Sequence, residues 1–345
     1  MDFSRIVLRV PNWLGDVVLA LPAMAAVRAR HPGAALTVVG PATILPIFDE
    51  GTALAPNHAV PADDPADERA ALAGGGYQLA LLFPNSFRSA WIARRAAVTE
   101  RWGYRTDFRR WLLTRAVPKP KGRIHQADYY RRLVGALGYD VDAGPPRIDV
   151  RPSTRARAAD VLGQYGRSPE DVLVGVAPGA AYGHAKRWPP SRVAEVLARL
   201  AGDRGATCVL LGAAGDRDAG REIESGLAAS PAARDRVINL IGRTDLRLLM
   251  GLMSCCHAFL SNDSGAMHLA AAIGLHVTSL FGPTDERVTA PIGDHDVLVR
   301  DVFCRPCLLR DCPIDHRCMA RIPASEVFDA VARRLDRAGA ERRPS

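Results

Sequence analysis

The sequence lacks a long hydrophobic run. No uninterrupted apolar stretch approaches the roughly 18–20 residues that a membrane-spanning helix needs. The opening MDFSRIVLRVPNWLGD also lacks the basic start, long apolar centre and small-residue cleavage site of a secretory signal. We therefore expect a protein that is made and kept in the cytoplasm.

Extremes of composition are absent as well. Hydrophobic residues make up 48% and charged residues 24% of the 345 residues, and no internal repeat stands out. This balance argues against a disordered, collagen-like or coiled-coil protein. At about 100–200 residues per domain, the length predicts two or three domains. Cores of that size fold without the support of disulfides or bound metals.

Acidic side chains are scarce in one segment. Between Arg88 and Arg132 there are thirteen Lys and Arg but three acidic residues, a local net charge of +10. The whole chain carries +8, so the remainder sums to −2. Seven aromatic residues are interleaved with these cations. Although a charge run is often only a solvated surface, this one predicts an anionic partner: a phosphate-bearing lipid, an acidic sugar or a nucleic acid.

Short apolar strands alternate with helical segments along the chain. In the first part, the pattern predicts elements at 6–10, 17–30, 35–40, 78–83, 87–97 and 126–137. A Pro- and Gly-rich segment at 138–152 precedes a second alternating series that runs from 155 to 281. Continuous apolar strands between helices indicate parallel sheets covered on both faces. We predict an α/β protein with two doubly wound domains, whose ligands bind at the carboxyl ends of the strands.

A glycine and a carboxylate follow the first strand, in the sequence Asn12-Trp13-Leu14-Gly15-Asp16. Glycine permits close backbone approach, and the following helix N-terminus favours an anion. Asp16 either caps that helix or projects as a general base. The spacing does not choose between the two roles.

A second motif follows the strand expected at 258–261. Asp263, Ser264 and the Gly265 backbone N–H surround a helix N-terminus, an arrangement suited to phosphate oxygens and sugar hydroxyls. The alternative is that Asp263 and Ser264 are ordinary caps and that His268 is a core residue.

A third motif runs from Pro178 to Trp188. A strand end, the Gly179-Ala180 turn and the cations Lys186 and Arg187 predict a second phosphate cradle. A solvated basic pair on a surface loop is the alternative. The segment does not match G-x-x-x-x-G-K-[ST], which argues against a P-loop NTPase.

Four of the seven cysteines fall within 15 residues: Cys304, Cys307, Cys312 and Cys318. Thiols clustered in this way predict a tetrahedral zinc, and four protein ligands would make its role structural. The later spacings are shorter than those of zinc fingers. An iron–sulfur cluster, redox-labile thiols or unligated cysteines remain as alternatives.

Four segments together resemble the ADP-heptose:lipopolysaccharide heptosyltransferase family. They are RVPNWLGDVVLALPAMAAVRARHPGA, LLFPNSFRSA, APGAAYGHAKRWP and SNDSGAMHLAAAIG followed by LFGPTDE, in the order of the family. The resemblance is strongest to the heptosyltransferase II branch, because of the Pro84–Ser89 sequence PNSFRS.

The resemblance implies a GT-B fold with two Rossmann-like domains. The first, 1–152, would bind the acceptor. The second, 153–323, would bind the nucleotide sugar and carry the Cys-rich loop 304–318. The last helix, 324–337, would pack back on the first domain.

The resemblance also assigns residues, with Asp16 as the general base. The donor-binding residues would be Gly179, Ala180, Lys186, Asp216, Thr244, Asp263, Ser264, Gly265 and His268. Together with the basic segment, it places acceptor binding on Asn12, Asn85, Ser86, Arg88, Arg105 and Arg123.

The implied activity is inverting transfer of L-glycero-D-manno-heptose from ADP-heptose to a heptose of the lipopolysaccharide inner core, on a Kdo-lipid A acceptor. No metal is expected in the chemistry, and zinc would be structural only. We expect a peripheral position at the inner face of the cytoplasmic membrane and no nucleic-acid partner, since no canonical nucleic-acid motif is visible. The alternatives are a related GT-B transferase that uses another nucleotide sugar, or a non-catalytic binder of anionic ligands or nucleic acid.

Overall fold

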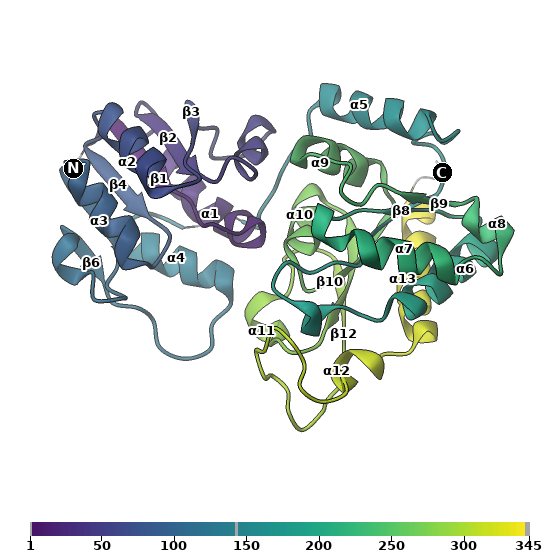
Figure 1. The fold of residues 1–345 in the computed structure, drawn as a ribbon. Helices are drawn as coiled ribbons and strands as arrows, with labels where there is room; N and C mark the ends of the chain where they lie inside the picture. The colour runs from purple at the N-terminus through teal and green to yellow at the C-terminus, as the bar shows by residue number, and fades with distance from the viewer. Residues whose placement is uncertain (1, 142–143, 342–345) are drawn as a thin grey trace. The chain divides into compact units, whose positions relative to one another are not determined.

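The chain folds into two units in the computed structural model, which describes residues 2–141 and 144–341 (Figure 1). The first unit is Met1–Asp149 and the second is Val150–Ser345, a division close to the boundary predicted after residue 152. Each unit contains one six-stranded sheet whose paired strands are all parallel. This architecture confirms the predicted α/β class.

The sheet of the first unit has the order β3-β2-β1-β4-β5-β6. Its strands are β1 (Arg5–Arg9), β2 (Ala35–Gly40), β3 (His58–Pro61), β4 (Leu79–Leu82), β5 (Glu100–Tyr104) and β6 (Arg115–Val117). In the register of the central strands, Leu8 lies opposite Val38 on one side and Leu81 on the other. Consecutive apolar residues favour these strands because both faces of the sheet are covered.

The helices of the first unit pack in two pairs. One pair is α1 (Leu14–Arg30) with α4 (Gln126–Ala136), and the other is α2 (Pro65–Gly74) with α3 (Phe87–Arg95). The second pair covers a core that includes Leu72 and Ile92. Helix α3 begins where the Ser86 side chain accepts a hydrogen bond from the Ser89 N–H, which fixes the end of the preceding loop.

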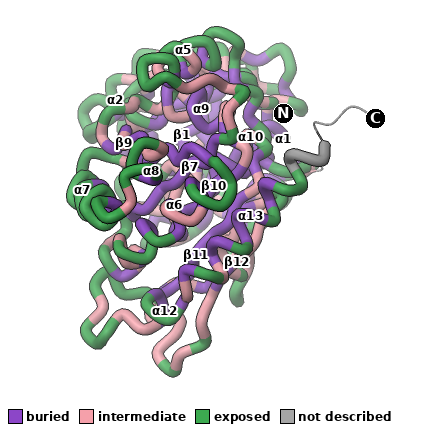
Figure 2. The backbone as a smooth tube through the Cα atoms, turned by 90° about the vertical axis from the view of Figure 1, so that its right-hand side faces the viewer, coloured by how far each residue is buried: buried purple, intermediate pink, exposed green. Residues whose placement is uncertain are grey.

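The sheet of the second unit has the order β12-β11-β10-β7-β8-β9. Its strands are β7 (Leu173–Ala177), β8 (Thr207–Leu210), β9 (Val237–Asn239), β10 (Ala258–Asn262), β11 (His276–Phe281) and β12 (His295–Val299). Strands β7, β10 and β11 run through the buried interior, whereas the turns of α7 (Arg217–Gly226) are mostly exposed (Figure 2).

Helices cover this second sheet as well. On one side α5 (Pro152–Gly163) packs on α9 (Leu246–Cys255), which also contacts α10 (Gly265–Ile273). A separate core joins α6 (Pro190–Arg204), α7 and α13 (Ala324–Glu341). Three one-turn helices complete the unit: α8 (Pro231–Arg234), α11 (Glu286–Thr289) and α12 (Arg317–Ala320).

Helix α13 lies in the core of the second unit. Its residues Val327 and Val331 are fully buried in the same cluster as Leu197 of α6. Arg334, 4% exposed, forms ion pairs with Asp294 and Asp296 beside β12. These buried residues belong to the core of the second unit, and the expectation that the helix also packs back on the first domain stays a prediction.

Both sheets share one topology, in which the first and fourth strands of the unit lie side by side. The strand order reverses between β1 and β4 in the first unit and between β7 and β10 in the second. In open α/β sheets, ligands bind beyond the carboxyl ends of the strands at this reversal. In the described part of the chain, no helix is both long and apolar enough to cross a membrane.

Candidate active site

The predicted acceptor residues gather at the carboxyl edge of the first sheet. Asn12 and Asp16 follow β1, while Asn85 and Ser86 follow β4, so the two pairs flank the point where the strand order reverses. The exposed cations come from the same edge: Arg88 in the first turn of α3, Arg105 after β5 and Arg123 after β6.

Asp16 lies inside the first turn of α1, where Trp13 occupies the N-cap position. Its Oδ1 accepts a hydrogen bond of 3.1 Å from the Tyr130 hydroxyl, and the Gln126 amide donates to the Tyr130 oxygen at 3.0 Å. Burial, and then the charge of Asp16, raise the pKa of Tyr130 well above its usual value. Tyr130 therefore remains a protonated donor that holds this carboxylate, a partner that the sequence did not reveal.

A buried ion pair supports Asn12. Arg9 Nε lies 3.2 Å from Glu68 Oε1, with both side chains at most 4% exposed. Arg9 Nη2 also donates to Asn12 Oδ1 at 2.9 Å. The arginine of β1 and the glutamate of α2 thus orient the amide of the loop. Neither was predicted, because a charged residue within an apolar strand gives no local sign of its partner.

Arg109 is fully buried, although the sequence counts it within the basic segment. Its guanidinium donates to the Tyr104 carbonyl at 2.9 Å, the Ser86 carbonyl at 3.1 Å and Ser89 Oγ at 3.0 Å. Burial lowers the pKa of Arg109 to about 10. This residue joins the loops after β4 and β5 and is not part of the exposed positive surface.

The predicted donor residues gather at the carboxyl edge of the second sheet. Lys186 belongs to a 3-10 turn after β7, and Asp263 directly follows β10. Lys186 Nζ lies 2.6 Å from Asp263 Oδ2, which also accepts a 2.6 Å hydrogen bond from Thr284 Oγ1. The Lys186 and Asp263 side chains are 12% and 5% exposed. The structure therefore rejects the interpretation of Lys186 as a solvated surface cation. It also shows Thr284 as a partner of Asp263 that was not predicted.

Asp216 is held beside this pair. It is 8% exposed, its Oδ1 lies 3.0 Å from Arg187 Nη2, and its Oδ2 accepts from the Ala213 N–H at 3.2 Å. Gly179 packs directly against it, since a Cβ there would lie 2.1 Å from Asp216 Cγ. Only glycine permits this approach. Ala180, the next residue of the turn, is buried.

The N-terminus of α10 provides the remaining donor residues. Ser264 precedes the helix, and its hydroxyl lies 3.1 Å from Ser261 Oγ. Gly265 is the first helical residue, whereas His268 is buried one turn later. The exposed N–H groups of a helix start favour an anion such as phosphate. Thr244, the other predicted donor residue, is half-buried and lies just before the Asp245 N-cap of α9.

Asn262 ties the two donor motifs together. Its Oδ1 accepts from the Trp188 N–H at 3.3 Å, and its Nδ2 donates to the Pro178 carbonyl at 2.6 Å. Asn262 is 2% exposed, so both bonds form in the interior. This buried amide fixes the loop after β7 against the end of β10, which places Lys186 beside Asp263. Local sequence does not distinguish the role of Asn262 from the roles of its neighbours.

The Cys-rich loop packs on the Lys186 turn. The Ala185 N–H donates to the Arg310 carbonyl at 2.8 Å, and His316 Nε2 lies 2.6 Å from the Ala185 carbonyl oxygen. The Tyr182 hydroxyl donates to the Leu308 carbonyl at 2.8 Å. These bonds give the loop a direct structural connection to the proposed phosphate site.

The four clustered thiols of Cys304, Cys307, Cys312 and Cys318 are not joined in disulfides. Burial, and then the charges of Cys312, Cys304 and Cys307, raise the pKa of Cys318. Within residues 2–141 and 144–341, however, no three His, Cys, Asp or Glu side chains are arranged to hold a metal ion. Structural zinc therefore stays a prediction from spacing, and we derive no chemistry from it.

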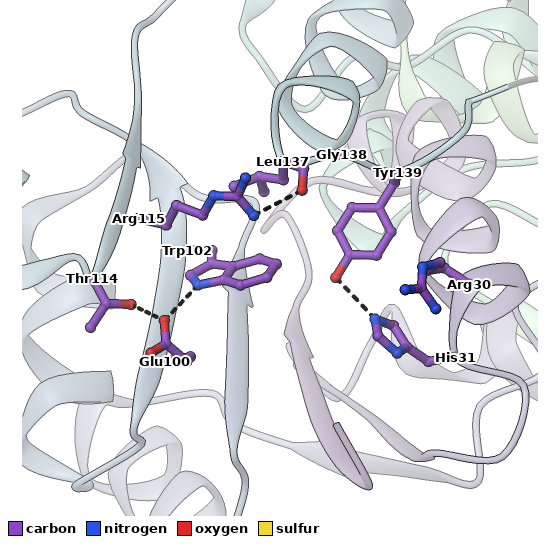
Figure 3. Close-up of a pocket in the computed structure, with 9 residues that line it drawn as sticks. All are labelled: Arg30, His31, Glu100, Trp102, Thr114, Arg115, Leu137, Gly138 and Tyr139. Carbon is purple, nitrogen blue, oxygen red and sulfur yellow. Dashed lines mark hydrogen bonds between the residues drawn. The ribbon is translucent and has the colours of Figure 1, made fainter. Parts of the chain in front are cut away.

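A cavity of about 450 Å³ lies elsewhere in the first unit. It opens at the amino-terminal edge of the sheet, where Glu100 begins β5 and Thr114 precedes β6. The Tyr139 hydroxyl lies 3.4 Å from His31 Nε2, and the Arg115 guanidinium donates to the Leu137 carbonyl (Figure 3). None of the predicted site residues lines this cavity. Its lining consists of Arg30, His31, Glu100, Trp102, Thr114, Arg115, Leu137, Gly138 and Tyr139.

Known proteins share both sequence and fold with this chain. The sequence profile of glycosyltransferase family 9 (heptosyltransferase) matches residues 68–317. Lipopolysaccharide heptosyltransferase 2 of Salmonella typhimurium is 31% identical over 310 residues, which cover 84% of this chain and 86% of that protein. Lipooligosaccharide heptosyltransferase 2 of Haemophilus influenzae is 29% identical over 312 residues, covering 84% and 86% respectively.

Solved structures extend the comparison to the fold. The structure of Escherichia coli ADP-heptose lps heptosyltransferase II superposes with a TM-score of 0.82 at 28% identity, covering 97% of this chain and 99% of that chain. An Escherichia coli heptosyltransferase solved with ADP superposes with a TM-score of 0.72 at 19% identity, covering 96% and 99% respectively, a likeness of fold alone. These neighbours are GT-B enzymes, so the predicted GT-B architecture is confirmed.

Proposed function

Because the chain belongs to glycosyltransferase family 9, the heptosyltransferases, we propose that it moves L-glycero-D-manno-heptose from ADP-heptose to a heptose of the lipopolysaccharide inner core. Relatives named lipopolysaccharide heptosyltransferase 2 support the acceptor class, and the name ADP-heptose lps heptosyltransferase II supports the donor. The observation that carries the proposal is the buried Lys186–Asp263 pair beside the N-terminus of α10.

The second unit would bind the nucleotide sugar. The Lys186 ammonium and the first N–H groups of α10 would face the diphosphate, which gains negative charge as it leaves. Asp263, which accepts a hydrogen bond from Thr284, holds the lysine in place, so little reorganisation is needed when ADP departs. Asp216 would receive donor hydroxyl groups, and Thr244 would lie toward the adenine.

The first unit would bind the acceptor and supply the general base. Asp16 takes the proton from the acceptor hydroxyl as that oxygen attacks the anomeric carbon from the face opposite ADP. The new C–O bond forms while the bond to the diphosphate breaks, and ADP leaves with the electron pair, so the configuration inverts. The Tyr130 hydroxyl holds the carboxylate in position for this step.

The exposed cations would recognise the acceptor. Arg88, Arg105 and Arg123 lie after three different strands at the same edge as Asp16. Phosphates and acidic sugars of an inner core would meet these guanidinium groups. No step of this account requires a metal ion.

A donor panel tests the proposal. Purified protein is incubated with a Kdo-lipid A acceptor that carries one heptose and, in parallel, with ADP-heptose, ADP-glucose, GDP-mannose and UDP-glucose. We expect transfer and thermal stabilisation with ADP-heptose, and at least about tenfold less transfer with the other donors. Equal or better transfer from another nucleotide sugar would instead establish a related transferase with a different donor.

A further inference from the structure

Four large aromatic side chains are exposed in one part of the first unit. They are Phe87, Trp91, Phe108 and Trp111, with exposed fractions of 37%, 41%, 94% and 59%. We call these four residues the aromatic patch. Single exposed apolar residues are ordinary, but a contiguous group marks an interaction surface.

Three rings of the patch contact one another. The Phe87 centroid lies 6.2 Å from that of Trp91 and 6.0 Å from that of Trp111, and the two tryptophan centroids are 6.4 Å apart. Helix α3 contributes Phe87 and Trp91, and the segment after β5 contributes Trp111. The fold thus assembles one aromatic surface from two segments.

The fourth ring is presented by a constrained loop. Asp107 and Phe108 both have left-handed backbones, with φ of 51° and 55°. The Asp107 carboxylate accepts a 2.7 Å hydrogen bond from the Phe87 N–H. The residue after Phe108 is the buried Arg109, whose guanidinium donates to the Tyr104 carbonyl and so anchors the loop. Left-handed conformations are unfavourable for residues other than glycine. The chain therefore adopts an unfavourable backbone at the point where it exposes almost all of a phenylalanine.

Cations accompany the rings. The Arg94 guanidinium lies 5.3 Å from the Trp111 ring, and that of Arg95 lies 6.0 Å from the Trp91 ring. Arg110 is also exposed beside Trp111. The one acidic residue of this loop, Asp107, is engaged with the start of α3. Aromatic rings flanked by arginines suit the interface of a bilayer with anionic headgroups, where rings enter the headgroup layer and cations meet phosphates.

The patch lies next to the proposed acceptor site. Phe87 immediately follows Asn85 and Ser86, and Phe108 belongs to the loop that begins with Arg105. We propose that the aromatic patch docks this enzyme on an anionic bilayer, so that its acceptor edge faces the lipid that carries the acceptor. The inference rests on the proposed function for its purpose, because a lipid-linked acceptor is presented at such a surface.

Vesicle flotation tests the docking directly. Wild-type protein is compared with Phe108→Ser/Trp111→Ser on phosphatidylcholine vesicles with and without phosphatidylglycerol. We expect wild-type binding that depends on phosphatidylglycerol and falls about tenfold or more in the double variant. Phe303→Ser is the matched control, because Phe303 of the second unit is 79% exposed and also lies under an arginine, Arg317. This control should bind vesicles as the wild type does.

A charge variant makes the test independent of the rings. Arg94→Glu/Arg95→Glu should lose binding to phosphatidylglycerol vesicles, whereas Arg192→Glu/Arg221→Glu, with the same change in net charge on the second unit, should retain it. Unchanged vesicle binding in both the aromatic and the charge variant would overturn the proposal. So would loss of affinity for a single-stranded oligonucleotide with vesicle binding intact, because the patch would then be a nucleic-acid surface.

A transfer assay separates this inference from the proposed function. Phe108→Ser/Trp111→Ser should transfer heptose to a delipidated, soluble acceptor at the wild-type rate, yet lose about tenfold or more with an acceptor embedded in vesicles. Equal activity on both acceptors would overturn the docking role alone. Absence of transfer by the wild type on both acceptors would overturn the proposed function and leave the flotation result standing.

Discussion

The two carboxyl edges hold their charges in opposite ways. In the second unit, Lys186 and Arg187 each pair with an aspartate, and the four side chains are at most 22% exposed. In the first unit, Arg88 and Arg105 are exposed, and Asp16 accepts a hydrogen bond from the neutral Tyr130 hydroxyl. A preorganised, desolvated edge suits a small donor of fixed shape. An open basic edge suits a large acceptor with several anionic groups.

This contrast has an energetic consequence. Removing one partner of a buried ion pair costs about 3–5 kcal/mol, because the other charge is left without compensation. Removing an exposed charge changes stability by about 0–1 kcal/mol. Variants of the buried pairs at the proposed donor edge should therefore affect folding and binding together, whereas variants of the exposed arginines at the proposed acceptor edge should affect binding alone.

The largest effect is expected at Asp16. Asp16→Asn removes the proposed base but keeps the shape of the side chain and the hydrogen bond from Tyr130, so kcat should fall by roughly 10²–10⁴-fold. Calorimetric titration should show ADP-heptose binding close to that of the wild type. Asp128→Asn, an exposed acidic residue in the first turn of α4, is the control and should keep full activity. Full transfer activity in Asp16→Asn would remove the general-base assignment.

The next effect concerns the buried pair of the donor edge. Asp263→Ala leaves Lys186 without its carboxylate, and the free energy of unfolding should drop by about 3 kcal/mol in urea denaturation. Affinity for ADP should fall as well, because the lysine loses its position. Arg88→Ala serves as the exposed comparison and should unfold at the wild-type urea concentration. If both variants had equal stability, the contrast between the two edges would not hold.

A smaller effect is expected at Gly179. The Cβ of Gly179→Ala would overlap Asp216, so we expect a loss of about 1–3 kcal/mol in stability and a raised KM for the donor. Gly215→Ala is the matched control from the same site, because a Cβ there meets nothing within 4 Å. Steady-state kinetics on both variants check the result. A wild-type donor KM in Gly179→Ala would show that the position of Asp216 does not matter for donor binding.

The acceptor edge should respond more weakly to any single change. Arg105→Glu reverses one exposed charge, so the KM for the acceptor should rise several-fold, which corresponds to a loss of about 1 kcal/mol of binding free energy. The donor KM should stay constant. The effect should shrink as salt is raised, because exposed charges are screened. A change confined to the donor KM would contradict the assignment of Arg105 to acceptor binding.

Metal content gives the last comparison. If the four clustered thiols hold zinc, elemental analysis of protein purified without chelator should give about one zinc per chain. Chelation should then lower the melting temperature, because the Cys-rich loop supports the Lys186 turn. Metal-free protein whose melting temperature does not respond to chelator would remove the zinc prediction.

Sequence patterns predicted the central elements well and the edges poorly. The strand predicted at 35–40 matches β2 residue for residue, and the helix predicted at 126–137 matches α4 to within one residue. Strands β3, β5, β6 and β12 were missed. The β3 sequence His-Ala-Val-Pro is largely exposed and β5 contains Glu100 and Arg101, so neither has the apolar run of a buried strand. Such strands form because a neighbouring strand is there to pair with, which local sequence does not record.

The same limit applies to the site. Glycine-containing turns and helix starts revealed Asp16, Lys186 and Asp263, because these features are local. Their partners were not visible, since Tyr130 is 114 residues from Asp16 and Lys186 is 77 residues from Asp263. Within the basic segment, local sequence also did not distinguish Arg109, which is buried and joins two loops, from its exposed neighbours. Candidate site residues could be predicted from the sequence where they lie within one turn. Their partners could not, because the fold brings them in from distant segments.

Separate calorimetric titrations of ADP and of a soluble inner-core fragment test the division of labour most directly. Lys186→Met and Arg105→Glu are each titrated with both ligands. The account predicts that Lys186→Met weakens ADP binding by about tenfold or more and leaves the acceptor fragment unaffected, because a charged hydrogen bond is lost at the donor edge alone. Arg105→Glu should do the reverse. Equal weakening of both ligands by either variant would contradict the assignment of donor and acceptor to different units.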